Sequence, residues 1–193
     1  MPAIYTIGHS TRSADEFLGV LQPAGVSLVA DVRAFPSSRR HPQFNGPALA
    51  EYLRGVGVGY RHLPGLGGRR SPVPGSPNGG WHDTAFQGYA DHMGTPEFQQ
   101  ALAELEAAAR DTPTAVMCAE AVWWRCHRRM IADALVVRGW RVGHLGIGDA
   151  PAIHELTDFA VVGPDRTLTY PPAQGVLPGI ASSGTDDAIE PLA

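Results

Sequence analysis

The sequence predicts an α/β fold, with a mostly parallel sheet of about five strands flanked by helices in a Rossmann-like three-layer architecture. Short apolar segments alternate along the chain with longer amphipathic ones, which is the pattern of βα units. Polar residues follow each apolar segment, as expected where strands end at a ligand-binding edge. With 193 residues, of which 44% are hydrophobic, the chain is predicted to form one domain over residues 1–170.

The N-terminal half contains three predicted strands. The first covers residues 4–8, and Ser13 with Glu16 three residues later forms a capping box for a helix that ends at Leu21. Residues 28–32 and 59–63 are the second and third strands, separated by a short helix over 46–53. Residues 64–81 are rich in Gly, Pro, Ser and Arg and lack periodicity, so they are predicted to form a long loop or lid.

The C-terminal half continues the alternation. Helices are predicted over 84–92 and 95–110, the second capped by Thr95 with Pro96 at its first position. A buried strand over 115–118 leads to a helix that begins near Arg125, which places His127 on the face that packs against the sheet. A fifth strand covers 141–145. Residues 171–193 have little to bury and are predicted to form a loosely ordered tail.

Composition narrows the function classes. All fifteen basic residues are arginines, which excludes a Walker P-loop lysine and a Schiff-base lysine. Residues 33–81 contain seven arginines and one acid, Glu51, which favours a local surface for anions although the net charge is −4. No segment has the about 20 apolar residues that span a bilayer, and no secretory signal is evident. We therefore expect a cytoplasmic protein with no membrane partner, whose two cysteines stay reduced.

Polar residues at the predicted strand ends are the main candidates for a site. We expect the carboxyl ends of parallel strands to gather them at one edge of the sheet. The candidates are His9 and Ser10 after the first strand, Asp31 and Arg33 after the second, His62 after the third, Cys118 and Glu120 after the fourth, and His144 after the fifth. Arg39 and Arg40 lie between prolines and have little structural role to fill, so they are predicted to face a ligand.

The segment from Cys118 to Arg129 combines a nucleophile, an acid/base and several cations. The predicted helix N-terminus and Arg128 would attract an anion and lower the pKa of a nearby cysteine. Each residue also has a structural interpretation, which the sequence leaves open. Cys118 is either a nucleophile or a small core residue, Glu120 is either a general base or half of an ion pair, and His127 either moves protons or packs the helix start.

The segments YTIGHSTRSADEFL, VADVRAFPSSRRHPQFN, YRHLPGLGGRR and VMCAEAVWWRCHRRMIADAL resemble the family of unknown function named DUF488. The resemblance covers about residues 3–145. It implies an intracellular α/β domain and marks the GHS, DVR, SRR, CAE and CHR residues as functional, but it implies no reaction. A weaker likeness concerns chemistry: the strand ending at Cys118, the arginine-containing loop and the following helix are similar to the active-site unit of rhodaneses and cysteine phosphatases. The loop here is longer than in those families, and AEAVWW contains no glycine.

The leading hypothesis is an enzyme that binds an anionic substrate, phosphorylated or nucleotide-like, and catalyses hydrolysis or group transfer. Arg33, Arg39, Arg40 and Arg128 would hold the anion with Asp31 and Ser10 nearby, and Cys118, Glu120, His127 and His9 would carry the chemistry. One alternative is a noncatalytic nucleic-acid or nucleotide binding module with Tyr60 and Trp81 as stacking faces. A second is a metal-binding protein, although no metal-ligand spacing occurs. The sequence predicts neither a cofactor nor an oligomeric state.

Overall fold

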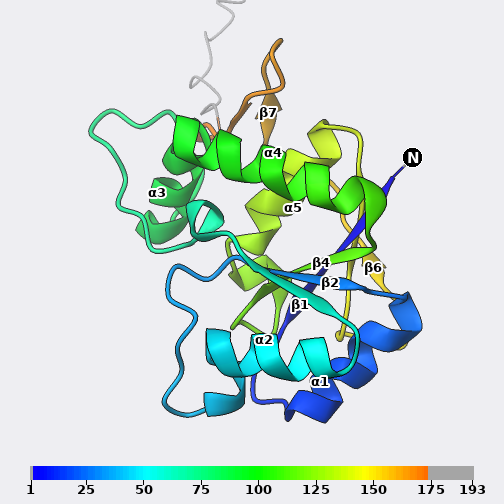
Figure 1. Ribbon diagram of the computed structural model, residues 1–193. Coiled ribbons are helices and arrows are strands. Elements are labelled where there is room, and N and C mark those ends of the chain that lie inside the picture. Colours follow the sequence, from blue (N-terminus) through cyan, green and yellow to red (C-terminus); the bar gives the residue numbers. More distant parts are fainter. Residues whose placement is uncertain (1, 174–193) are drawn as a thin grey trace, which may run out of the picture.

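A computed structural model describes residues 2–173 and contains a six-stranded sheet in the order β3-β2-β4-β1-β5-β6 (Figure 1). Its strands are β1 (Ala3–Gly8), β2 (Leu28–Asp31), β3 (Gly59–His62), β4 (Thr114–Cys118), β5 (Arg141–His144) and β6 (Ala152–Ile153). The first five are parallel and β6 is antiparallel to β5. The predicted α/β class and mostly parallel sheet are confirmed. The short β6 and a hairpin of β7 (Val161–Val162) and β8 (Leu168–Thr169) were not predicted.

Helices cover both faces of the sheet, which gives the predicted three layers (Figure 1). The helices are α1 (Ala14–Leu21), α2 (Gly46–Gly55), α3 (Thr84–Met93), α4 (Pro96–Asp111) and α5 (Arg128–Val137). Helices α1 and α2 share one hydrophobic core with one face of the sheet, and α3, α4 and α5 share a second core with the other face. Successive residues of β4 alternate between these cores: Ala115 and Met117 face α1 and α2, whereas Val116 and Cys118 face α5.

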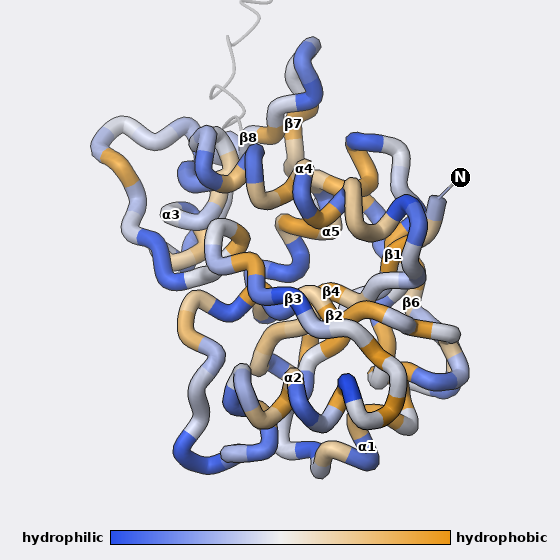
Figure 2. The backbone as a smooth tube through the Cα atoms, in the orientation of Figure 1, coloured by the Kyte–Doolittle hydropathy of each residue, from blue (hydrophilic) through white to orange (hydrophobic). Residues whose placement is uncertain are grey.

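Local sequence signals account for the helix starts. Ser13 and Glu16 form the predicted capping box of α1, and the Thr95 hydroxyl caps α4 with Pro96 in its first turn. Hydrophobic residues are concentrated in β1, β2 and β4 at the centre of the sheet (Figure 2), because strands covered on both faces expose little to water. The predicted tail lies almost wholly in residues 174–193, outside the described residues.

The predicted start of the fifth helix near Arg125 is wrong. Residues Trp123–Arg125 form a short 3₁₀ turn, Cys126 is extended, and α5 begins at Arg128 with His127 as its N-cap. The 3₁₀ turn brings the Trp123 ring onto the buried ring of His144, with centroids 4.1 Å apart and nearly parallel planes. This packing interrupts the helical pattern that the sequence suggests, and it leaves Cys126 in the loop just before the helix.

The connections after the central strands diverge. β1 and β2 lead towards α1 and α2 on one face of the sheet, whereas β4 leads to α5 on the other face. Loops that part in this way leave a crevice beyond the carboxyl ends of adjacent strands. In residues 2–173 no helix combines the length and the apolar character that crossing a membrane requires.

Candidate functional site

A hollow of about 780 Å³ lies at the carboxyl ends of β1, β2 and β4, and we call it the strand-end hollow. It is lined by His9, Ser10, Thr11, Arg33, Ala34, Phe35, Ser37, Ser38, Arg40, His41, Gly68, Arg69, Cys118, Ala119, Glu120, Ala121, Cys126 and His127. Seven of the ten predicted site residues are in this set. Its volume suits a small organic ligand such as a nucleotide.

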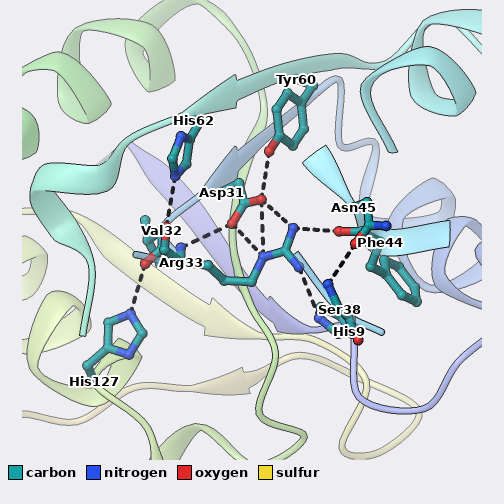
Figure 3. Close-up of polar contacts among 10 residues, drawn as sticks. All are labelled: His9, Asp31, Val32, Arg33, Ser38, Phe44, Asn45, Tyr60, His62 and His127. Carbon is teal, nitrogen blue, oxygen red and sulfur yellow. Dashed lines mark hydrogen bonds and ion pairs between the residues drawn. The ribbon is translucent and has the colours of Figure 1, made fainter. Parts of the chain in front are cut away.

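Arg33 forms the wall of the strand-end hollow through a buried ion pair with Asp31, at the end of β2 (Figure 3). Its Nη2 lies 2.6 Å from Asp31 Oδ2 and also donates to the Phe44 carbonyl at 2.8 Å. Tyr60 donates its hydroxyl proton to the same carboxylate at 2.7 Å. Because Asp31 already neutralises this guanidinium, Arg33 shapes the hollow more than it adds net charge to it.

His9 lies beside Arg33 and is neutral. Its Nδ1 donates to the Ser10 carbonyl at 2.9 Å, and Nε2 lies 3.4 Å from Arg33 Nη1, an atom that only donates. The ring stacks on Phe44, with centroids 4.2 Å apart. Burial, helped by the charge of Arg33, lowers the pKa of His9 from 6.5 to about 4. A neutral imidazole with one unprotonated nitrogen can accept a hydrogen bond or a proton near neutral pH.

Cys126 and Cys118 meet at another part of the strand-end hollow lining. Their Sγ atoms lie 3.0 Å apart, and Cys126 Sγ lies 3.5 Å from His127 Nδ1. Burial alone would raise the pKa of Cys126, but the hydrogen bond from Cys118, the His127 ring and the charge of Arg128 hold it well below its ordinary value. Burial and the neighbouring Cys126 raise the pKa of Cys118. Of the two cysteines, Cys126 is therefore the one whose surroundings favour a thiolate.

His127 is oriented by the backbone of β2 and the residue after it. Its Nε2 lies 3.2 Å from the Val32 carbonyl, as His62 Nε2 lies 2.8 Å from the Arg33 carbonyl (Figure 3). A carbonyl only accepts, so Nε2 carries a proton, and Nδ1 is the nitrogen that can take the Cys126 proton and then donate to the thiolate. The order of nucleophile, base and orienting acceptor is that of a cysteine–histidine catalytic pair.

Two cations on the strand-end hollow carry uncompensated charge. Arg40 and Arg69 are exposed, and neither forms an ion pair with a residue of the described chain. Arg69 has a φ of 64°, a left-handed conformation that non-glycine residues seldom adopt. Ser10, on the other side of the hollow, has a φ of 51°. Two of the three non-glycine residues with positive φ in the described chain thus line the hollow, which is typical of functional sites.

Glycines permit the close approach of the walls. A Cβ on Gly8 would lie 1.7 Å from the Glu120 carbonyl oxygen, so the loop after β4 passes over β1 only because residue 8 has no side chain. A Cβ on Gly68 would lie 3.0 Å from His127 Nδ1. Gly8 and Gly68 therefore contribute through their lack of a side chain.

Three predicted ligand residues do not line the strand-end hollow. Asp31 is buried behind Arg33, and Arg39 is exposed outside the set of lining residues. Arg128 is only 1% exposed. It holds the loop after β4 in place by donating to the Glu120 carbonyl at 2.6 Å, and it also donates to Thr6 Oγ1 at 3.4 Å. Glu120 itself lines the hollow, and its exposed carboxylate makes no hydrogen bond with a described residue.

The end of β5 belongs to a different set of residues, which we call the enclosed network: Asp133, His144, His154 and Tyr170. His144 Nε2 lies 3.0 Å from His154 Nδ1, and His154 Nε2 lies 2.8 Å from Asp133 Oδ1. Tyr170 donates to Asp133 Oδ2 at 2.9 Å. All four side chains are buried. His144 lies at a strand end, as the sequence predicts, but it does not line the strand-end hollow.

The strand-end hollow is also lined by Cys126, Arg69, His41 and Phe35, which are not among the ten predicted site residues. The signal for Cys126 was its position directly before His127 and the helix start, where a thiolate is stabilised. Nothing in the sequence distinguished Arg69 from the other arginines of residues 33–81. Trp81, offered as a stacking face, packs instead with Phe86, Phe159 and Tyr170. Among residues 2–173, no group of three His, Cys, Asp or Glu side chains is placed to hold a metal ion.

Together these features define a three-layer α/β protein with a pocket of cysteine, histidine and arginine at its strand ends. The chain belongs to the DUF488 family: the family model described as "Domain of unknown function DUF488" matches residues 13–135. The matched region contains β2, β4, the loop with both cysteines and most of α5. Comparison with curated proteins and with solved structures finds no match to either.

Proposed function

We propose that this protein is a cytoplasmic enzyme that binds an anionic substrate, phosphorylated or nucleotide-like, in the strand-end hollow and hydrolyses it or transfers a group from it. The observation that carries the proposal is the arrangement of Cys126 Sγ, His127 Nδ1 and the Val32 carbonyl, with free cations nearby. A thiolate poised beside an oriented histidine is the requirement for nucleophilic catalysis. Cys126 replaces Cys118 as the nucleophile in this proposal.

Each step follows from the positions of these groups. Arg40 and Arg69 bind the anion, and the Cys126 thiolate attacks its electrophilic centre. A bond forms from sulfur to that centre, and the bond to the leaving group breaks with its electron pair. The leaving group takes from His127 the proton that His127 accepted from Cys126. Water or an acceptor hydroxyl then attacks the same centre, gives its proton to His127 and releases the thiolate.

The first test measures whether Cys126 is a thiolate next to an anion site. We expect iodoacetamide to alkylate Cys126 in preference to Cys118, with a rate that is already high at pH 6, as peptide mapping by mass spectrometry would show.

His127→Gln should shift the pH dependence of this alkylation to higher pH, and phosphate or a nucleoside monophosphate should protect Cys126. Arg40→Ala with Arg69→Ala should remove the protection and leave the pH profile unchanged. Alkylation that begins only at the pH of an ordinary thiol would refute the proposal.

The second test measures turnover. A panel of aryl phosphate mono- and diesters and nucleotides is incubated with the wild-type protein and with Cys126→Ser. We expect Cys126→Ser to lower kcat by at least about 100-fold, since its hydroxyl is not ionised near neutral pH. Arg39→Ala is the matched control for the arginine variants, because Arg39 lies outside the strand-end hollow. Its turnover should equal that of the wild type.

A nucleotide or single-stranded nucleic-acid binding module remains the second candidate, and Phe35 favours it. Its side chain is 72% exposed on the rim of the strand-end hollow, near Arg40 and Arg69. Exposed aromatic rings beside arginines bind single strands by stacking on bases. This candidate predicts that Phe35→Ala weakens binding of a short oligonucleotide by about 1 to 3 kcal/mol while Cys126→Ser leaves binding intact. The enzyme proposal predicts instead that Cys126→Ser lowers turnover much more than Phe35→Ala does.

A further inference from the structure

The two cysteines of the chain form a pair that the proposed reaction uses only in part. Cys118 and Cys126 are the only cysteines in the sequence, and both are free in the structure. Their sulfurs are 3.0 Å apart, whereas a disulfide bond measures about 2.0 Å, so a displacement of about 1 Å would join them. The proposed hydrolysis or transfer needs one thiolate. It gives no reason for a second thiol in contact with the first.

The surroundings distinguish the two sulfurs. Cys126 has His127 Nδ1 on one side and the buried Arg128 guanidinium nearby, both of which favour a thiolate. Cys118 lies at the end of β4, where one donor, the Glu120 amide 3.3 Å from its sulfur, does not offset the burial and the contact with Cys126 that raise its pKa. Both residues are buried but line the strand-end hollow, which is the route by which a small solute would approach the pair. One sulfur is an attacking thiolate and the other is a resolving thiol within contact distance.

We propose that a peroxide that enters the strand-end hollow oxidises Cys126, and that Cys118 then closes a reversible Cys118–Cys126 disulfide. The Cys126 thiolate attacks one peroxide oxygen, the O–O bond breaks, and the departing hydroxide takes a proton to become water. Cys126 is now a sulfenic acid. The Cys118 sulfur attacks the Cys126 sulfur, the S–S bond forms and the S–O bond breaks. The hydroxide leaves with the Cys118 proton as a second water. Two thiols and one hydrogen peroxide thus give one disulfide and two waters.

The surroundings also make this disulfide easy to reduce. Groups that stabilise the thiolate stabilise the reduced protein, and a disulfide whose reduced form is stabilised is a strong oxidant. His127 and Arg128 play this part for Cys126. A small dithiol such as dithiothreitol therefore reverses the reaction and becomes a cyclic disulfide itself. A purely structural disulfide would resist it.

Formation of the disulfide would also stop the proposed reaction, a consequence that rests on the proposed function. The disulfide uses the electron pair of the Cys126 thiolate, so the nucleophile is lost until a reductant restores it. The loop between the cysteines is held by Arg128 through the Glu120 carbonyl and does not need to unfold for the bond to form. Oxidation would therefore switch the site off while the fold stays intact.

The experiment treats the full-length protein with one equivalent of hydrogen peroxide and measures its intact mass and free thiols. We expect the loss of two hydrogens and of both thiols, with recovery in dithiothreitol. Cys118→Ser should instead accumulate a sulfenic acid on Cys126 that dimedone traps. Cys126→Ser should react at least about tenfold more slowly, because Cys118 is the protonated partner. Thermal melting of each variant confirms that it is folded.

The outcomes separate this inference from the proposed function. If the wild type keeps both thiols, or if over-oxidised sulfur appears without the disulfide, the inference is wrong whatever the turnover. If the disulfide forms and reverses but Cys126→Ser leaves turnover unchanged, the proposed function fails and the redox pair stands. The wild-type mass alone decides the first point, so the conclusion does not depend on the folding of a variant.

Discussion

The strand-end hollow and the enclosed network lie at neighbouring strand ends of one sheet, yet they use their polar side chains differently. In the enclosed network, two histidines lie between Thr6 and Asp133 in a single chain of hydrogen bonds. Its four side chains are all buried. In the strand-end hollow, Arg40 and Arg69 are exposed, and Cys126, although itself only 4% exposed, lines the same space. Similar residue types therefore serve folding in one place and are available to a ligand in the other.

The hydrogens of the enclosed network have one consistent arrangement. Arg128 only donates and the Asp133 carboxylate only accepts, so each group between them accepts from one side and donates to the other. Thr6 donates to His144 at 2.6 Å, His144 to His154, and His154 to Asp133. A chain with both ends fixed leaves no capacity for a ligand, whereas the strand-end hollow keeps unpaired charge and a thiolate.

Asp133→Ala tests the structural role of the enclosed network most directly, and it should have the largest effect on stability. Asp133 accepts from His154, Tyr170 and the Thr157 amide, and its removal leaves three buried donors without an acceptor. We expect a loss of about 3 to 5 kcal/mol in the free energy of unfolding, measured with urea. Asp83→Ala is the control, because the exposed Asp83 caps α3 and should cost only about 1 kcal/mol. Equal losses in both variants would show that the enclosed network has no special role.

Gly8→Ala should have the next largest effect, and it acts on the strand-end hollow. The new methyl group would lie 1.7 Å from the Glu120 carbonyl oxygen, so the loop between the two cysteines has to move. We expect a loss of about 1 to 3 kcal/mol in the free energy of unfolding, together with slower alkylation of Cys126. Gly19→Ala is the matched control: it lies in α1, where a new methyl group would have nothing within 4 Å, and it should be neutral or slightly stabilising. A Gly8→Ala protein as stable as the control would contradict this account of the loop.

The sequence predicts the sheet and most helix boundaries well because those signals are local. The capping box at Ser13, the Thr95–Pro96 start and the apolar strands each lie within a few residues. The site is predicted less completely because its assembly depends on strand order. With β4 between β2 and β1, the ends of these three strands meet, while His144 on β5 falls into the enclosed network. The stacking of Trp123 on His144, which delays the start of α5 to Arg128, is likewise a long-range contact that no local pattern encodes.

Acid should distinguish the two regions through the pH dependence of their stability. Burial lowers the pKa of His144 from 6.5 to about 3 and that of His9 to about 4. Above pH 6.5 both histidines are neutral in the folded and the unfolded protein, so they add no pH dependence. As the pH falls below 6.5, only the unfolded chain binds these protons, so stability is lost between pH 6.5 and the two folded pKa values. The slope is at most about 1.4 kcal/mol per pH unit for each histidine.

The share of His9 in this acid sensitivity should be the smaller one, because water in the strand-end hollow screens its charge. Urea unfolding between pH 7 and pH 4.5 measures the slope for the wild type, His144→Gln and His9→Gln. Each variant should flatten the slope, and His144→Gln should do so more strongly. It should also lower stability at pH 7, because it interrupts the chain from Thr6 to His154. If His9→Gln flattens the slope more than His144→Gln, the enclosed network is more open to water than its burial indicates, and the contrast between the two regions loses its physical basis.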